Sequence, residues 1–257
     1  MRVEIGPPER QRWAKVLIYS PPGHGKTHFL GTAQADPRTA PMLVVDFEGG
    51  TESLVGLDID VARMRSWSDF YEVARMLKAG KHEYKSIGLD SLSEVNRFSM
   101  NTILEQEGPG RRDPDSLQLQ DWGKIRTQVS RVARLFRDLE MHVFFTSHDQ
   151  EITDPREGEI KVPSFIPQGL RVELPGMVDI CAYLALSTRP NKEGEYARFL
   201  LLKNFPKYGV KARTPWNSEI PDMVEDPTVT TLFDALGIGD DQTRRRRVRV
   251  VRKGVTE

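Results

Sequence analysis

Residues 14–35 read AKVLIYSPPGHGKTHFLGTAQA, and this stretch decides the fold expected for the chain. An apolar run of strand length, 14–20, leads into a loop rich in proline and glycine, and a helical pattern follows from about Lys26 to Ala35. The loop, SPPGHGKT at 20–27, fits the pattern G-x-x-x-x-G-K-[ST] at every fixed position except the first, where Ser20 stands in place of glycine. A strand, this loop and a helix in that order predict a phosphate-binding loop, the alternative being a chance Pro/Gly turn.

The expected chemistry of this loop follows from its backbone and two side chains. Backbone N–H groups and the positive end of the following helix can surround a polyphosphate, and Gly23 and Gly25 allow it to approach closely. Lys26 would reach the β and γ phosphates, and the Thr27 hydroxyl would bind Mg²⁺. The sequence therefore predicts ATP and Mg²⁺ as cofactors. The residues expected to bind the nucleotide are Pro21, Pro22, Gly23, His24, Gly25, Lys26, Thr27 and His28.

Working outward, strand-length apolar runs alternate with helical patterns. Further strands are expected at 41–50, 60–65, 84–93 and 141–148. Helices are expected at 68–79, from the end of the fourth strand to about 107, and at 118–138. This alternation predicts an α/β fold, with a mostly parallel central sheet flanked by helices.

The pattern changes after residue 148. A polar loop is expected at 149–168, followed by two strands, VDICAYLAL (178–186) and EYARFLLLKN (195–204), which form an antiparallel hairpin through the turn STRPNKEG. A short helix is expected at about 230–236. We predict one domain over 1–239 and a basic, disordered tail over 240–257.

Composition limits the classes of protein that the chain can be. Among its 257 residues, 38% are hydrophobic and 29% are charged, as in globular proteins. No apolar run approaches the about 20 residues that span a bilayer, and the first residues lack the apolar core of a signal peptide, so a cytoplasmic protein with no membrane partner is expected. The single cysteine, Cys181, excludes an intramolecular disulfide and a Cys-rich zinc site, and its apolar neighbours favour a buried position.

The charge is balanced overall but unevenly distributed. The chain has 37 basic and 37 acidic residues, and residues 244–257 contain seven of the basic ones and a single acid, Glu257. An acidic domain with a basic tail indicates an extension that contacts a polyanion, although such runs are often simply solvated.

Acidic residues end two of the predicted strands. Asp90 follows Ile87-Gly88-Leu89 and would hold Mg²⁺ together with Thr27. Asp46 and Glu48 end the strand at 41–50 on the same side, and Glu48, nearer the loop and longer, is the candidate general base that activates water. The alternative is that these acids are solvated strand ends.

The strand at 141–148 ends in Thr146-Ser147-His148, polar groups expected at the same carboxyl edge of the sheet. They would either sense the γ phosphate or cap the loop that follows, and the sequence leaves both readings open.

Together these motifs resemble the RecA-like ATPase core over about 12–215, and most closely the phage recombination ATPases of the Sak4 type, which are grouped with AAA-like ATP-binding proteins. The resemblance implies that Glu48 is the catalytic base and that Lys211 and Arg213 reach into the nucleotide of an adjacent subunit. An ordinary basic edge strand is the alternative for these two cations. The resemblance also places DNA-binding loops at 108–119 and 149–168, where Arg111, Arg112 and Lys161 would contact phosphates.

The function expected from this resemblance is a Mg-ATP-dependent ATPase that acts on single-stranded DNA in phage-type recombination, annealing or replication. It would work as a homo-oligomer, ring or filament, in the cytoplasm of an infected host, with a single-strand DNA-binding protein as a further candidate partner. Two alternatives share the core: a nucleotide-gated loader or switch with negligible turnover, and a helicase or packaging motor.

Overall fold

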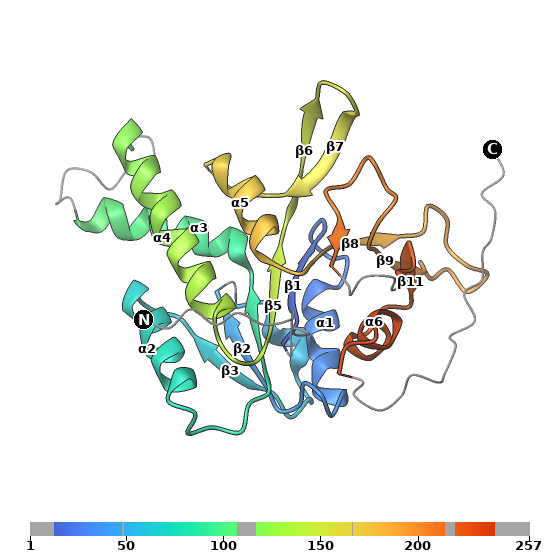
Figure 1. Cartoon of the computed structure of the whole chain (residues 1–257), viewed down its shortest axis with the longest axis horizontal. Coiled ribbons are helices and arrows are strands. Elements are labelled where there is room, and N and C mark those ends of the chain that lie inside the picture. Colours follow the sequence, from blue (N-terminus) through green and yellow to red (C-terminus); the bar gives the residue numbers. More distant parts are fainter. Residues whose placement is uncertain (1–12, 48, 107–116, 166, 214–218, 240–257) are drawn as a thin grey trace, which may run out of the picture.

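The computed structural model describes residues 13–47, 49–106, 117–165, 167–213 and 219–239. Within these residues, nine strands form one sheet with the order β11-β9-β8-β1-β5-β4-β2-β3, and β10 also pairs with β8 (Figure 1). The strands of this sheet are β1 (Lys15–Tyr19), β2 (Met42–Asp46), β3 (Asp60–Arg63), β4 (Ser86–Asp90), β5 (His142–Ser147), β8 (Ile180–Leu186), β9 (Arg198–Leu201), β10 (Lys211–Ala212) and β11 (Met223–Glu225).

A separate two-stranded hairpin and six helices complete the described fold. The hairpin consists of β6 (Asp149–Asp154) and β7 (Gly158–Pro163), and it projects from the sheet (Figure 1). The helices are α1 (Lys26–Gly31), α2 (Trp67–Lys78), α3 (Leu92–Gln106), α4 (Leu119–Arg137), α5 (Gly169–Met177) and α6 (Val229–Leu236), with short 3₁₀ segments at η1 (Thr32–Ala35) and η2 (Thr51–Leu54).

The predicted α/β architecture is confirmed. β1 is parallel to β5 and β8, β4 is parallel to β2 and β5, and β2 is parallel to β3. The predicted C-terminal hairpin is also present, because β9 runs antiparallel to β8 with Tyr183 opposite Leu201. The carboxyl ends of all the parallel strands therefore meet at one edge, and β5 lies between the strand that enters the loop and the strand that ends in Asp90.

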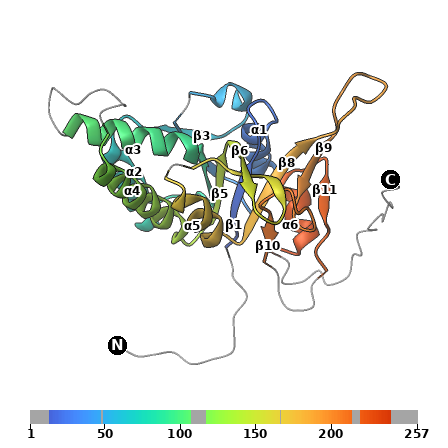
Figure 2. The ribbon, with the colours of Figure 1, turned by 90° about the horizontal axis from the view of Figure 1, so that it is seen from above.

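Alternation along the central strands builds an apolar core on each face of the sheet. On β1, Leu17 and Tyr19 pack in a cluster that contains side chains of α2, α3, α4 and α5. Val16 and Ile18 point to the other face, where α1 and α6 cover them. Figure 2 shows α2, α3, α4 and α5 grouped together, with α6 beside β9 and β11. Both faces of the central strands are therefore shielded from water, which explains why these strands are continuous apolar runs in the sequence.

Gly88 lets α1 pack closely against the sheet. A Cβ atom at this position would lie 2.6 Å from Met42 Cε, closer than real Cβ contacts allow, and 3.2 Å from Leu30 Cδ1, a tight contact that would require Leu30 to shift. The glycine in the middle of β4 therefore makes room for Leu30 of α1, the helix that begins directly after the candidate phosphate loop.

Several helices begin at the residues that cap them. The backbone N–H of Ser66 donates to the Asp69 carboxylate at 2.9 Å at the start of α2, and Gln118 N–H donates to Asp121 at the same distance at the start of α4. These contacts satisfy N–H groups that a helix leaves unpaired at its first turn.

The segment 149–168 differs from the expected loop. Ile152, Ile160 and Val162 alternate with polar residues, and this period-two pattern forms β6 and β7. The turn between them is held by Asp154 Oδ1, which accepts from the N–H groups of Arg156 and Glu157 at 2.8 and 3.0 Å. The alternation was not recognised in the sequence because this stretch contains many charged residues. Helix α5 was also missed, because Pro175 and Gly176 within it favour a turn in the sequence.

The buried His142 makes the stability of the domain depend on pH. Its Nδ1 accepts a hydrogen bond from Ala14 N–H at 3.1 Å, a contact that requires the neutral ring. Burial, and secondarily the positive charge of Lys15, lowers the pKa of His142 to about 4. Histidine in the unfolded chain titrates at about 6.5, so the unfolded state binds more protons between these values. The stabilisation is therefore complete above about pH 6.5 and decreases as the pH falls toward 4.

We expect the effect of His142 to lower the free energy of unfolding by on the order of 2 kcal/mol when the pH falls from about 7 to 5. Urea unfolding at both pH values measures this loss in the wild type and in His142→Gln, whose amide oxygen can still accept from Ala14. The variant should lose less stability on acidification. Equal losses in the two proteins would contradict the assignment.

Candidate nucleotide-binding site

The predicted phosphate loop lies at the carboxyl edge of the sheet, between β1 and α1. Gly25 precedes α1 with φ 99° and ψ 26°, and Gly23 has φ 80°. Both are left-handed conformations that side chains with a Cβ disfavour, so the glycines of the motif are required by the path of the backbone. Gly25 also accepts the first hydrogen bond of the helix, from Phe29 N–H at 2.8 Å.

The Lys26 ammonium is held inside the curve of the loop. Its Nζ donates to the carbonyl oxygens of Ser20 and Pro21 at 2.9 and 3.0 Å, and the residue is only 7% exposed. A positive charge is thus fixed among the backbone atoms that would surround a phosphate. The departure from the motif at Ser20 leaves this contact intact, because it uses the backbone carbonyl.

The two predicted metal ligands lie in direct contact. Thr27 Oγ1 donates to Asp90 Oδ2 at 2.5 Å, and the hydroxyl of Thr146 donates to the other carboxylate oxygen, Oδ1. Asp90 is 7% exposed at the end of β4. A hydroxyl and a carboxylate beside a phosphate loop are the oxygen donors with which nucleoside triphosphatases hold Mg²⁺, so these residues fit that ion.

The remaining residues of the loop differ in where they lie. Pro22 and Gly23 are exposed at its tip, Pro21 is half-buried, and His28 is exposed on the first turn of α1. The ring of His24 instead contacts the sheet, with Nδ1 3.1 Å from the carbonyl oxygen of Leu184 in β8. The side chain of His24 therefore ties the loop to the neighbouring strand.

Asp46 ends β2 directly beside Asp90, its partner in the parallel register. Its Oδ1 accepts from Gly49 N–H at 2.9 Å, which shapes the turn after the strand. Glu48, the predicted base, is outside the described residues.

The sequence leaves two roles open for residues 146–148, sensing of the γ phosphate and capping of the loop that follows. The side chains at the end of β5 are divided between two locations. Thr146 faces Asp90, whereas the Ser147 hydroxyl donates to the His148 carbonyl at 2.8 Å and lies 3.1 Å from Ser93 Oγ. Ser93 Oγ in turn donates to the Ser164 carbonyl at 3.3 Å. Thr146 thus belongs to the candidate site, and Ser147 belongs to the connection toward the β6–β7 hairpin.

Lys211 and Arg213 lie at the opposite edge of the sheet. β10 pairs with the amino end of β8, with Lys211 opposite Cys181, and both cations donate to the Gly176 carbonyl, at 3.4 and 3.1 Å. Burial and the nearby charge of Arg213 lower the pKa of Lys211. The structure does not bring this pair to the phosphate loop of the same chain.

Of the three predicted DNA contacts, Arg111 and Arg112 are outside the described residues. Lys161 lies on β7, with its Nζ 3.8 Å from Asp149 and 3.7 Å from Glu151. Its ammonium also lies 5.8 Å from the ring centroid of Tyr183. The charge of Lys161 is therefore shared with two acids of its own hairpin.

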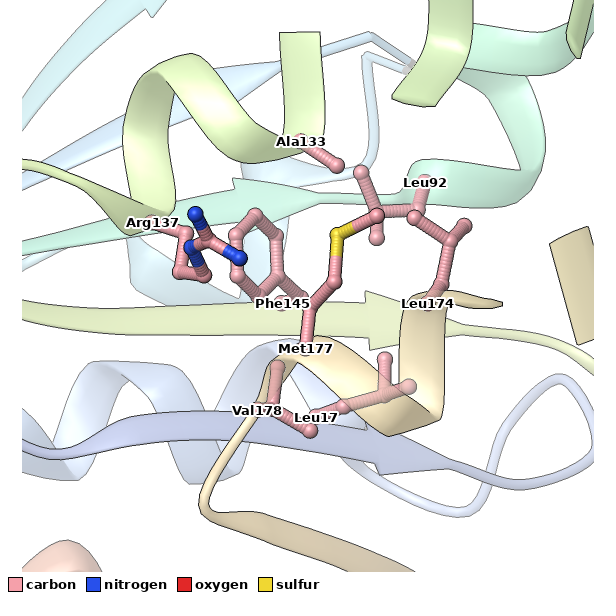
Figure 3. A pocket seen from close by; sticks show the side chains of 8 residues that line it. All are labelled: Leu17, Leu92, Ala133, Arg137, Phe145, Leu174, Met177 and Val178. Atoms are coloured by element: carbon pink, nitrogen blue, oxygen red, sulfur yellow. The ribbon is translucent and has the colours of Figure 1, made fainter. Parts of the chain in front are cut away.

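One small cavity lies on the face of the sheet opposite α1, between the sheet, α4 and α5 (Figure 3). Its volume of about 10 Å³ is that of a packing gap and cannot admit a nucleotide. It is lined by Leu17, Leu92, Ala133, Arg137, Phe145, Leu174, Met177 and Val178.

The described residues contain no group of three or more His, Cys, Asp and Glu side chains arranged to hold a metal. Cys181 is buried as expected, and burial raises the pKa of its thiol to about 12. Within the described part of the chain, each helix is too short or too polar to cross a bilayer.

The fold and this loop define a P-loop ATPase domain built on a mostly parallel sheet. The chain belongs to the AAA domain family, whose model matches residues 12–214. No curated protein matches the sequence.

Solved structures with a similar fold include a KaiC-like protein from the hyperthermophilic archaeon Pyrococcus horikoshii OT3, at 16% identity and a TM-score of 0.47, covering 83% of this chain and 89% of that one. The RadB recombinase is 13% identical with a TM-score of 0.46, covering 82% and 86%. An ATPase from the type III secretion system of pathogenic bacteria is 12% identical with a TM-score of 0.42, covering 67% and 51%.

Proposed function

We propose that this chain hydrolyses Mg-ATP as a homo-oligomer on single-stranded DNA, in phage-type recombination, annealing or replication within the host cytoplasm. The observation that carries the ATPase part is the contact between Thr27 and Asp90 beside the Lys26 ammonium. Lys26 and Thr27, neighbours in the loop, meet Asp90, which lies 63 residues beyond Thr27, at one edge of the sheet, in the combination that phosphoryl transfer requires.

Each residue has a definite part in the proposed reaction. The loop 21–28 surrounds the triphosphate, and Lys26 neutralises its β and γ oxygens. Thr27 and Asp90 hold Mg²⁺, which when bound offsets negative charge on the phosphate oxygens. Thr146 orients the Asp90 carboxylate through its hydrogen bond. Glu48 accepts the proton of the attacking water, a role that stays a prediction from the sequence resemblance.

Lys211 and Arg213 are proposed to complete the site of a neighbouring subunit. Their position at the amino edge of the sheet, away from their own loop, supports a contribution between subunits. A cation placed on the transferring phosphate from a second subunit makes hydrolysis depend on assembly.

Arg213→Ala is expected to lower the ATPase kcat by a factor on the order of 10³ while leaving the affinity for ATP nearly unchanged. A mixture of Arg213→Ala and Lys26→Ala subunits should regain part of the activity, because an intact loop then meets an intact arginine. Steady-state ATPase rates of each variant and of the mixture measure this, with the exposed Arg75→Ala as a control. Failure of the mixture to exceed either variant alone would refute action between subunits.

The DNA part of the proposal is supported by the sequence resemblance and by the basic run at 244–257, which is outside the described residues. The test is the ATPase rate with and without single-stranded DNA. Strong stimulation supports the proposal. Slow, unstimulated turnover with ATP-dependent assembly supports a loader or switch, and directional unwinding supports a motor.

The role of the tail is tested separately, by single-strand binding at several salt concentrations with and without residues 244–257. Removal of phosphate contacts should reduce both the affinity and its dependence on salt. A single-strand DNA-binding protein can then be added to ask whether it is a partner.

A further inference from the structure

Arg198 lies against the phosphate loop, although no motif in the sequence connects the two. A Cβ atom built on Gly25 would be 3.3 Å from Arg198 Nε and 4.0 Å from its Cδ. Gly25 immediately precedes Lys26, and its backbone belongs to the turn that would contact the phosphates. The guanidinium end of Arg198 is therefore adjacent to the loop of its own subunit.

The β8–β9 hairpin holds Arg198 in this place. Arg198 begins β9 opposite Leu186, at the end of β8 that extends past the carboxyl edge of the sheet. The contact between His24 and the Leu184 carbonyl ties the loop to the same hairpin, two residues from this pair. Figure 2 shows the loop of the hairpin projecting beyond the sheet, with β8 and β9 leading into it. Two independent contacts thus join the hairpin to the phosphate loop.

Within the part of the chain that the structure describes, the Arg198 side chain has no acidic partner in this position. Among the described residues it makes no ion pair within 4.0 Å and no side-chain hydrogen bond, and it is exposed. Arg38 and Arg134, by contrast, are paired with Asp36 and Glu173. An uncompensated guanidinium beside a loop that also holds the Lys26 ammonium raises the positive potential there, which an anion would relieve.

We propose that Arg198 binds the phosphate chain of the nucleotide held by the P-loop of the same subunit. This inference rests on the proposed binding of Mg-ATP at that loop. The guanidinium is planar and carries several donors, so it matches phosphate oxygens in pairs. Because it already lies beside Gly25, rotation of its side chain brings these donors toward phosphates seated on the loop. The role is distinct from that of Arg213, which lies at the other edge of the sheet.

Arg198→Gln tests the proposal, and Arg189→Gln is its matched control. Arg189 lies in the connection between β8 and β9 and is exposed. Its replacement therefore removes the same charge from the hairpin while leaving the phosphate loop unaltered. The affinity of the full chain for Mg-ATP is measured by calorimetry for the wild type and both variants. Inorganic tripolyphosphate, measured in competition with ATP, reports phosphate binding without the base.

Arg198→Gln is expected to weaken the binding of both ATP and tripolyphosphate by roughly 10- to 100-fold, with Arg189→Gln unchanged and Arg198→Lys intermediate. Unfolding curves of the variants should match the wild type, because the side chain is exposed. Unchanged ATP affinity in Arg198→Gln would overturn the inference, as would weakened ATP binding with unchanged tripolyphosphate binding, which indicates contact with the base. Absence of ATP binding in the wild type would instead overturn the proposed function itself.

Discussion

Lys26→Ala is expected to reduce ATP hydrolysis below detection. In the structure the Lys26 ammonium is bound by the carbonyl oxygens of Ser20 and Pro21, inside the loop. No other described side chain places a cation within the loop itself, so the variant leaves the phosphate oxygens without this charge. A cation aimed at developing charge in a site of low dielectric is worth several kcal/mol, and a loss of about 4 kcal/mol is roughly a thousandfold in rate.

The measurement is phosphate release at saturating Mg-ATP, with Lys78→Ala as the matched control. Lys78 is exposed at the end of α2. Its replacement should leave turnover intact. Thermal unfolding must be measured in parallel, because the Lys26 ammonium also holds the loop closed. Retained turnover in a folded Lys26→Ala protein would contradict the assignment of the whole site.

Asp90→Asn is expected to lower kcat by a factor on the order of 10²–10³, the cost seen when one preorganised electrostatic group is removed from an active site. The amide keeps the shape of the side chain and can still accept from Thr27 or Thr146, so the domain should fold. It carries no negative charge, however, and therefore binds Mg²⁺ weakly.

The dependence of the ATPase rate on Mg²⁺ concentration tests this explanation. Asp90→Asn should need more Mg²⁺ for a half-maximal rate. Thr146→Val should show a smaller shift in the same direction, because the hydroxyl that it removes only orients the Asp90 carboxylate. Asp58→Asn, an exposed acid remote in sequence, is the control. An unaltered Mg²⁺ dependence in Asp90→Asn would exclude Asp90 as a metal ligand.

The sequence predicted the sheet well because its strands are buried on both faces. Runs such as 14–20 and 141–148 are mostly apolar and buried along almost their whole length, and they match β1 and β5 closely. The loop was also predictable, since its glycines are demanded by backbone conformations at Gly23 and Gly25 that other residues disfavour. Thr27 and Asp90 were expected to share a metal, and the structure brings them into contact.

Contacts made by partly exposed strands were not predictable. β6 and β7 alternate weakly among many charged residues, so this stretch resembled a loop. The ring of His24 turned out to contact a strand 160 residues away, which no local pattern indicates. The contact of Arg198 with the phosphate loop could not be predicted either, because the position of Arg198 depends on the register of β9 against β8 and not on its neighbours in sequence. Glu48 stays a prediction.

If Arg213 acts on the P-loop of a second copy, as proposed, its separation from the P-loop of its own chain constrains how copies associate. Each molecule then offers an arginine at one rim and receives one at the other, either in an antiparallel two-fold pair or in a head-to-tail contact. A head-to-tail contact either closes on itself after a fixed number of copies or continues without limit. In an open array the last molecule always lacks a donor, so short arrays should hydrolyse less ATP per molecule than long ones, whereas a closed array has no such deficit.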